Sequence, residues 1–282
     1  MKRRIAIQGY KGSFHEMAAR RFYAPDAACP IPGDGIEVVE CATFEQLFER
    51  VADHSADAAV MAIENTVSGG LLPNFELLRS NSLPVRGETY LRIEQNLMAL
   101  PGQGIEDIHE VRTHYMAINQ TREFFKRYPH IRLVESEDTA GSAAQIASEH
   151  LAGVGAVASA MAAETYGLQI IAQGIETYKQ NFTRFLVLDP TIDAGPQRAD
   201  KASLCFTLPH KPGSLASILT ILSFYEMNLT RIQSLPIPGH EWQYFFYADI
   251  RFESYERYRQ ALAAVRPLME ELRILGEYIS AL

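Results

Sequence analysis

The sequence predicts an α/β protein whose chain ends in a smaller βαββαβ unit, and three observations lead to this prediction. Short apolar runs alternate with amphipathic segments as far as about residue 188. A polar stretch with Pro and Gly follows over 189–201, and a second, independent series of apolar runs occupies 202–282. The 282 residues, of which 47% are hydrophobic and 21% are charged, are enough for about two domains with a core in each.

Strands and helices are expected to alternate in the first part of the chain. Short segments rich in apolar or β-branched residues predict strands at 5–7, 36–39, 58–63, 85–93, 97–100, 111–113, 131–134, 154–158 and 185–188. Apolar residues at helical spacing predict helices at 13–23, 43–52, 75–79, 117–127 and 139–150. The helix over 43–52 also has a start signal, because Thr43 and Gln46 have the spacing of a capping box.

The segment after the polar stretch has an element order of its own. Its strands are expected at 204–208, 229–234, 244–250 and 274–279, and its helices at 214–225 and 254–272. Pro267 lies inside the second helix and would kink or shorten it. This βαββαβ order is the ferredoxin-like arrangement, which hosts many functions and therefore indicates no chemistry by itself.

The charge balance and the hydropathy pattern argue against two kinds of partner. The chain has 26 Lys and Arg against 34 Asp and Glu, a net charge of −8, so we expect no nucleic-acid partner. The longest stretch without a charged residue or His runs from Pro212 to Tyr225 and is too short to span a bilayer. The first eight residues lack the apolar core of a signal peptide. We therefore expect a cytoplasmic protein with no membrane partner.

No metal, nucleotide or nucleophile motif is complete in this sequence. The three cysteines are far apart, and His109 and His114 are one residue too widely spaced for a zinc-binding helix. The run 153–158 matches GxGxxA but has a predicted helix before it and a strand after it, the reverse of a dinucleotide site. We therefore expect neither metal nor cofactor, and catalysis would rest on hydrogen-bond donors and charges in a cleft.

Polar clusters follow several predicted strands, at the edge where open α/β sheets bind ligands. The turn over 9–14 leads into a helix whose free N–H groups suit an anion. A second cluster is 64–66, and a third is Thr113-His114 ahead of a helix carrying Gln120. A fourth, 181–185, opens the last strand of this domain. Residues of these types also commonly cap helices and turns, so their chemistry alone leaves a shared site and simple capping both open.

In order and spacing, these clusters resemble the motifs of the prephenate dehydratase family. The matching stretches are Gly9 to Phe14 with Ala18-Ala19, Glu64-Asn65-Thr66 with Gly69, Thr113-His114 with Gln120, Asp138 to Gly141, Tyr166 to Leu168 and Asn181 to Phe185. The C-terminal part, with Pro212 to Leu215 and Asn228 to Thr230, resembles the regulatory ACT domain of that family. No chorismate mutase-like segment precedes the match, so the chain resembles the stand-alone bacterial form.

The resemblance implies a two-lobed catalytic domain over 1–188, like type II periplasmic-binding proteins, with the active site in the cleft. A linker over 189–201 and an ACT domain over 202–282 would follow. The implied reaction turns prephenate into phenylpyruvate, water and carbon dioxide in phenylalanine biosynthesis, without a cofactor. Arogenate dehydratase, whose substrate carries an amine in place of the keto group, is an alternative that spacing does not separate. A ligand-binding sensor of the same fold is the rival from another class.

The resemblance assigns catalysis to Thr183, which we interpret as a positioned hydrogen-bond donor to the leaving oxygen. Glu64 is the alternative proton donor. The residues expected to bind substrate are Ser13, Asn65, Thr113, Gln120, Arg184 and Phe185. Among them, Arg184 is the candidate carboxylate clamp. His15, where the family usually has Ser, is expected to be an exposed residue of the first helical turn.

The resemblance also implies feedback inhibition by phenylalanine bound between two ACT domains, and hence a homodimer or a dimer of dimers. The expected contacts are Gly213, Ser214, Leu215, Asn228 and Leu229. The run Gln233 to Pro236 stands where the family commonly has Glu-Ser-Arg-Pro, so two charged residues are missing from this region. Feedback inhibition and a desensitised domain retained for dimerisation therefore both stay open.

Overall fold

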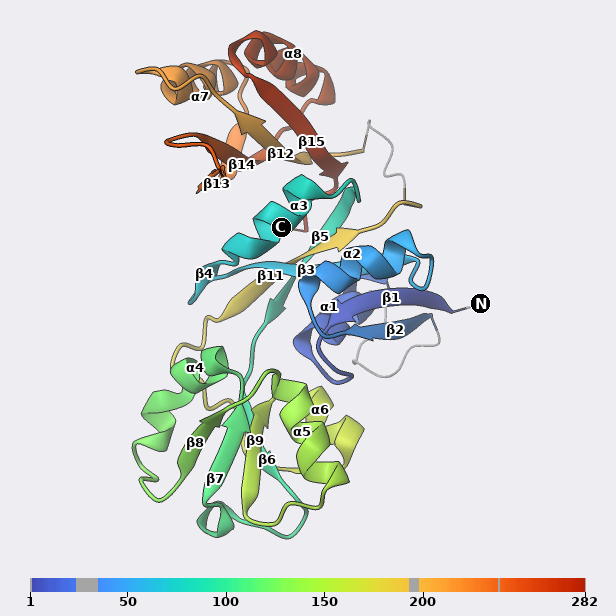
Figure 1. The fold of residues 1–282 in the computed structure, drawn as a ribbon, viewed down its shortest axis with the longest axis vertical. Coiled ribbons are helices and arrows are strands. Elements are labelled where there is room, and N and C mark those ends of the chain that lie inside the picture. The colour runs from blue at the N-terminus through green and yellow to red at the C-terminus, as the bar shows by residue number, and fades with distance from the viewer. Residues whose placement is uncertain (1, 24–34, 193–197, 238, 282) are drawn as a thin grey trace. The chain divides into compact units, whose positions relative to one another are not determined.

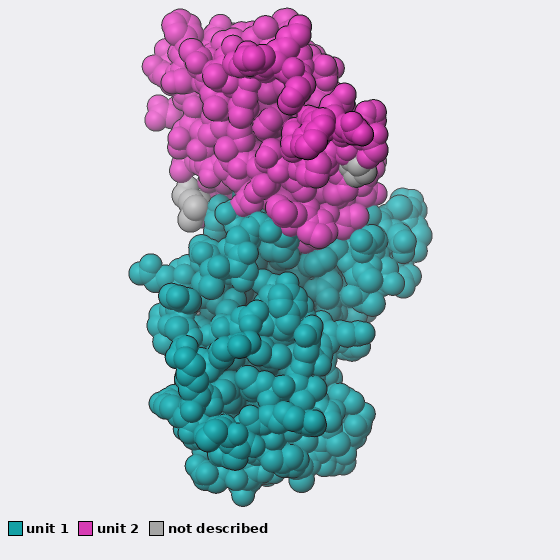
Figure 2. Space-filling view, turned by 60° about the vertical axis from the view of Figure 1, so that its left-hand side comes forward, with its two compact units in different colours: residues 1–71, 89–185 teal, residues 72–88, 186–282 magenta. Residues whose placement is uncertain are grey.

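The chain changes unit at three places, so each of the two units of the structure combines two separate segments. This computed structural model describes residues 2–23, 35–192, 198–237 and 239–281. Residues 1–71 and 89–185 form the first unit, and residues 72–88 and 186–282 form the second (Figure 2). The predicted boundary at residue 188 stays a prediction, and residues 193–197 of the predicted linker lie outside the described residues.

The first sheet contains the N-terminal strands (Figure 1). Its strands are β1 (Arg3–Gln8), β2 (Ile36–Cys41), β3 (Ala58–Asn65), β4 (Gly69–Gly70), β5 (Val85–Arg92) and β11 (Phe182–Leu188). Their order is β2-β1-β3-β11-β5, with β4 paired to β3. The helices α1 (Phe14–Tyr23) and α2 (Phe44–Ala52) pack against β1 and β3, whose apolar residues are fully buried. This continuous burial is typical of a parallel sheet covered on both faces.

The second sheet forms the other lobe of the first unit. Its strands are β6 (Asn96–Ala99), β7 (Glu110–Thr113), β8 (Arg132–Glu135), β9 (Val154–Ala158) and β10 (Gln169–Ala172), in the order β10-β6-β9-β7-β8. The chain passes from the first sheet to the second at 93–95 and returns at 173–181. The predicted α/β fold with two lobes is therefore confirmed.

Helices cover both faces of the second sheet because its strand residues alternate between the faces. On one face, Met98 and Ala156 pack with α5 (Thr139–Ser148) and α6 (Ala160–Tyr166). On the other face, Leu97 and Val157 pack with α4 (Tyr115–Phe125). Each helix begins at the carboxyl end of a strand, so the first turns of α4 and α5 lie at one edge of the sheet.

The second unit contains a four-stranded antiparallel sheet in the order β13-β14-β12-β15. Its elements are β12 (Lys201–Thr207), α7 (Ser214–Phe224), β13 (Asn228–Pro236), β14 (Tyr244–Arg251), α8 (Tyr255–Val265) and β15 (Glu271–Tyr278). The helices α7 and α8 bury one face of this sheet (Figure 1). The predicted ferredoxin-like order βαββαβ is confirmed.

The helix α3 (Leu72–Ser80) belongs to the same unit and contacts side chains of this sheet. The Phe75 and Tyr247 rings meet edge to face with centroids 4.6 Å apart, and the Arg231 guanidinium lies 4.8 Å from the Phe75 ring centroid. Arg273 donates hydrogen bonds to the backbone carbonyls of Arg79 and Asn81. A segment far away in sequence is therefore a structural part of the second unit.

The main departures from the predicted elements have local causes. The last helix ends at Val265 and not at residue 272, because Pro267 has no N–H to continue the α-helical bonds and a 3₁₀ turn, Arg266–Leu268, takes over. The sequence interpretation missed α6 and β10. The short helix α6 begins at the N-cap Ser159 and ends at Gly167, which has a left-handed φ of 66°. Among the described residues, no helix has the length and apolar character needed to cross a membrane.

Candidate active site

A cavity of about 220 Å³ lies between the two lobes of the first unit. The first lobe contributes residues from the ends of β1, β3 and β11 and from the start of α1, and the second contributes the first turns of α4 and α5. Of the predicted site residues, Ser13, Asn65, Gln120, Thr183 and Phe185 line this cavity. All five are buried, so they gather in one partly enclosed space.

The backbone fixes the orientation of the Asn65 amide. Its Oδ1 accepts hydrogen bonds from the N–H groups of Val67 and Ser68, both at 2.9 Å. Its Nδ2 therefore donates, to Thr183 Oγ1 at 2.9 Å and to Asn181 Oδ1 at 2.6 Å. The Thr183 hydroxyl has no other partner in the described part of the chain. Its own proton is thus available to a group in the cavity.

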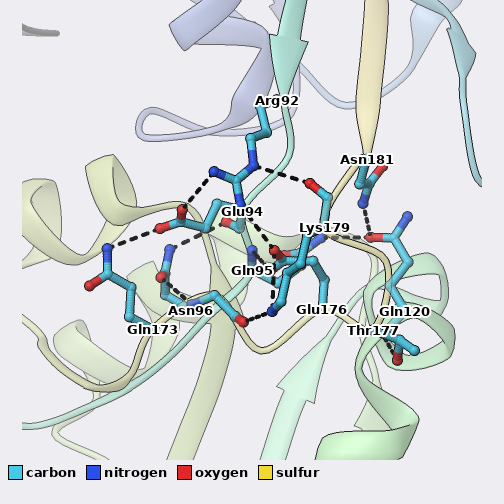
Figure 3. Close-up of polar contacts among 11 residues, drawn as sticks. Arg92, Glu94, Gln95, Asn96, Gln120, Gln173, Glu176, Thr177, Lys179 and Asn181 are labelled. Carbon is cyan, nitrogen blue, oxygen red and sulfur yellow. Dashed lines mark hydrogen bonds and ion pairs between the residues drawn. The ribbon is translucent and has the colours of Figure 1, made fainter.

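The same ordering of donors and acceptors continues to Gln120 (Figure 3). Because Asn181 Oδ1 accepts from Asn65, Asn181 Nδ2 is the donor to Gln120 Oε1, at 3.1 Å. Gln95 Nε2 donates to the same oxygen, also at 3.1 Å. Gln120 Nε2 is therefore left as a donor on a residue that lines the cavity.

His15 lines the cavity and is half-buried, so the expectation of an exposed residue is wrong. Its Nε2 accepts a hydrogen bond from the Ala62 backbone N–H at 3.3 Å, and its ring meets the Phe185 ring edge-on with centroids 5.1 Å apart. Burial lowers the pKa of His15 to about 4, because the imidazolium form loses its hydration. At neutral pH, His15 is thus an uncharged part of the wall.

Three predicted site residues lie outside the cavity lining. The Thr113 hydroxyl is buried and donates to the Val157 carbonyl at 2.7 Å. Arg184 stands between two cavity residues on β11, so strand alternation turns it to the opposite face, where it is buried. Glu64 is half-buried on β3 and its backbone pairs with β4. Their roles in binding or catalysis stay predictions, and this arrangement gives them no support.

Carboxylates take two N–H groups of the turn over 9–14, so the anion site expected there stays a prediction that these contacts do not support. The Lys11 N–H donates to Glu40 Oε1 and the Gly12 N–H to Glu16 Oε2, both at 2.6 Å. The carbonyl of Gly12 accepts a 2.5 Å hydrogen bond from the Ser159 hydroxyl of the other lobe. A Cβ at Gly12 would lie 2.7 Å from the Ala162 Cα, so glycine permits this close approach. The turn joins the two lobes.

The charged groups at the cavity are mainly acidic. Glu137 and Asp138, at the start of α5, line it, and its described lining contains no Lys or Arg. Burial raises the pKa of Asp138, whose Oδ1 accepts from the Gly141 N–H at 2.7 Å, and burial lowers the pKa of His114. The sequence interpretation left both acids out of the site, although they follow β8 at the same edge as His114 follows β7. Among the described residues, no three metal-binding side chains gather.

The family follows from comparison of the whole chain with known proteins. A family model described as "Prephenate dehydratase" matches residues 5–192. The chain belongs to the prephenate dehydratase family. An Arabidopsis thaliana protein named "Arogenate dehydratase/prephenate dehydratase 2, chloroplastic" is 35% identical, over 98% of this chain and 72% of its own length.

Two solved structures extend the family resemblance to the whole fold. A prephenate dehydratase from Arthrobacter aurescens, solved in complex with L-Phe, has a TM-score of 0.82 and 28% identity, covering 98% of this chain and 90% of its own. A structure titled "GqqA- a novel type of quorum quenching acylases" has a TM-score of 0.86 and 30% identity, and the match covers 99% of this chain and 98% of its own. Proteins with this fold thus carry names for different activities.

A second groove, of about 430 Å³, lies within the ferredoxin-like unit of this family member. Ser214 and Leu215, at the start of α7, line it together with the 208–212 loop and Trp242. Of the residues predicted to bind phenylalanine, Gly213, Asn228 and Leu229 lie outside this lining. The structure brings together only part of the predicted regulatory site, and its role stays a prediction.

Proposed function

We propose that this protein is a carbon–oxygen lyase that converts prephenate into phenylpyruvate, water and carbon dioxide. The observation that carries the proposal is the hydrogen bond from Asn65 Nδ2 to Thr183 Oγ1, at 2.9 Å. This bond leaves the Thr183 proton as a donor toward the cavity. Family membership supplies the substrate, and the amide and hydroxyl donors supply the chemistry that its elimination needs.

The reaction breaks two bonds of the substrate ring. The bond between C1 and its carboxylate breaks, carbon dioxide leaves, and the electron pair moves through the ring as the C4–oxygen bond breaks. The departing hydroxide takes one proton from the solution and becomes water, while the ring becomes aromatic. Thr183 donates a hydrogen bond to the leaving oxygen and stabilises the charge that develops there, which is the effect of an oxyanion-hole donor. Gln120 Nε2 is a second donor that orients the substrate.

Arogenate is the alternative substrate, since the Arabidopsis relative carries both names. Two acidic side chains in the lining, Glu137 and Asp138, would suit its ammonium group. An acylase reaction needs a nucleophile activated by a base. The Thr183 hydroxyl is bonded to an amide and, among the described residues, to no imidazole or carboxylate, which favours the dehydratase.

The deciding experiment compares prephenate and arogenate on one purified sample, with formation of phenylpyruvate or phenylalanine as the readout. We expect turnover of prephenate without added metal or cofactor. Turnover of arogenate alone would change the substrate and keep the reaction. Tight binding of either compound without turnover would favour the sensor alternative, and inertness toward both would overturn the proposal.

The second unit is a regulatory ACT domain in this proposal, and phenylalanine binds in its groove and inhibits the enzyme. The L-Phe complex of the Arthrobacter relative and the place of Ser214 and Leu215 in the groove support this role. A homodimer or a dimer of dimers would complete the site, and sedimentation with and without phenylalanine tests the assembly. The stand-alone bacterial form and the cytoplasmic location stay predictions.

A further inference from the structure

The two segments that connect the lobes are tied together by a buried carboxylate (Figure 3). Glu176, on the returning segment, is 1% exposed, and its Oε2 accepts from the Gln95 backbone N–H at 2.9 Å. Arg92 and Lys179 lie 3.8 and 3.6 Å from its other oxygen. The Gln95 carbonyl in turn accepts from the Ile175 N–H at 2.7 Å. Gln95 therefore has a backbone held on both sides.

Gln95 is one of the residues that line the cavity, and it is buried, with 3% exposure. Its Nε2 must be the group that donates to Gln120 Oε1, because that oxygen also accepts from Asn181. Two backbone N–H groups fix the orientation of the Asn65 amide, and Asn65 in turn fixes that of Asn181. The orientation of the Gln95 amide therefore follows from the backbone and is not an arbitrary choice. Gln95 Oε1 is left as a buried acceptor with no donor among the described residues.

An unpaired buried acceptor costs free energy, and a ligand that brings a donor removes this cost. Prephenate at neutral pH has two carboxylates and a keto group, which only accept hydrogen bonds. Its ring hydroxyl is its single donor, and this hydroxyl is the group that leaves. We propose that Gln95 Oε1 accepts a hydrogen bond from the ring hydroxyl of the substrate, which makes Gln95 a further substrate-binding residue. This inference rests on the proposed function.

Gln95 and Thr183 then have complementary roles on one hydroxyl. The hydroxyl donates a hydrogen bond to Gln95 Oε1, so its lone pairs are oriented to accept one from Thr183. A ligand without the hydroxyl gains nothing from Gln95. Phenylpyruvate, the product, is such a ligand and serves as the probe.

The experiment replaces Gln95 by Met, which keeps the length and removes the amide. For Gln95→Met, we expect kcat/KM for prephenate to fall about tenfold to a hundredfold. The inhibition constant of phenylpyruvate should stay within about twofold of the wild-type value, since no hydrogen bond to the product is lost. Gln173→Met is the matched control, because Gln173 bonds to Glu94 in the same network but is exposed and outside the cavity. It should change neither quantity.

Equal losses for prephenate and phenylpyruvate would overturn the inference, because they would mean that Gln95 only shapes the cavity. Unchanged kcat/KM would overturn it as well. If Gln95→Met does not fold, Gln95→Asn is the second variant, because it keeps an amide but withdraws the oxygen by one carbon. Here too, kcat/KM for prephenate should fall and the inhibition constant of phenylpyruvate should not change. A wild-type protein without activity on prephenate would instead contradict the proposed function, so the two failures are distinguishable.

Discussion

Asn65 Nδ2 donates a hydrogen bond to Thr183 Oγ1 at 2.9 Å across the neighbouring strands β3 and β11. The hydroxyl is thereby an acceptor toward the protein and a donor toward the cavity. Two residues separated by more than a hundred positions thus form one hydrogen-bonded pair. A neutral hydroxyl is a weak acid, so the value of this arrangement lies in placing a donor and not in transferring a free proton.

Thr183→Ala removes that donor. We expect kcat with prephenate to fall by about 10²–10³-fold with a much smaller change in KM, because the lost bond forms mainly to the oxygen that gains charge in the transition state. Thr183→Ser keeps the hydroxyl and is the control that should retain most of the activity. Steady-state kinetics measures both. Near-normal turnover in Thr183→Ala would remove Thr183 from the mechanism.

Glu64→Gln tests the rival proton donor. Since Glu64 lies outside the cavity lining, the substitution should leave in place the alkaline limb of the pH–rate profile, where a catalytic acid loses its proton. Asn65→Ala, which breaks the contact with Thr183, should lower kcat in the same assay. Loss of the limb in Glu64→Gln would transfer the role of proton donor to the carboxyl.

The sequence was sufficient for the parts of the site that depend on strand ends. Asn65 ends a predicted strand and Gln120 lies on a predicted helix that follows another strand, so their place at the carboxyl edge follows from the α/β order. Thr183 opens its strand, so this rule does not place it there, and only the folded chain brings it to Asn65. Consecutive residues of a strand face opposite sides of the sheet. Because Thr183 and Phe185 face the cavity, Arg184 between them must point away from it. That signal was present in the sequence.

Other features depend on contacts that no local pattern encodes. The N–H groups of the 9–14 turn bond to Glu40 and Glu16, and only the folded chain brings Glu40 to that turn. The burial of His15 requires Phe185, far away in sequence, to cover it. The inclusion of α3 in the second unit likewise rests on long-range packing, such as that of Phe75 on Tyr247.

His15 should make the stability of the protein depend on pH. Its pKa is about 4 in the folded protein and near 6.5 when unfolded, so between these values the unfolded chain binds more protons. The free energy of unfolding should therefore fall as the pH drops from 6.5 to 4, by about 2 kcal/mol for a partly exposed ring. Urea unfolding at pH 7 and pH 5 measures the change. His15→Gln should reduce the slope and the exposed His240→Gln should not; equal slopes in all three proteins would contradict this assignment.

Trp242 offers a direct readout of the regulatory groove. It is the single Trp of the chain, it lines the groove with Ser214 and Leu215, and it is 73% exposed. Phenylalanine bound there should change the environment of the indole, so tryptophan fluorescence should titrate with phenylalanine and not with aspartate. Leu215→Asp should weaken the response by placing a charge in the groove. No fluorescence change and no inhibition at millimolar phenylalanine would indicate a desensitised domain.

Glu88 and Lys201 form a buried ion pair inside the second unit. Lys201 Nζ lies 2.9 Å from both carboxylate oxygens, and the two side chains are at most 2% exposed. Glu88→Gln removes the carboxylate that lies beside the buried Lys201 ammonium and should lower the free energy of unfolding by about 3–5 kcal/mol. The double variant Glu88→Leu with Lys201→Met removes both charges and should be more stable than the single variant, because the buried ammonium is removed together with the carboxylate. Denaturant unfolding of the wild-type protein, the single variants Glu88→Leu and Lys201→Met and the double variant measures the coupling. If the double variant loses as much as the two single substitutions added together, the pair contributes no coupling energy and the argument fails.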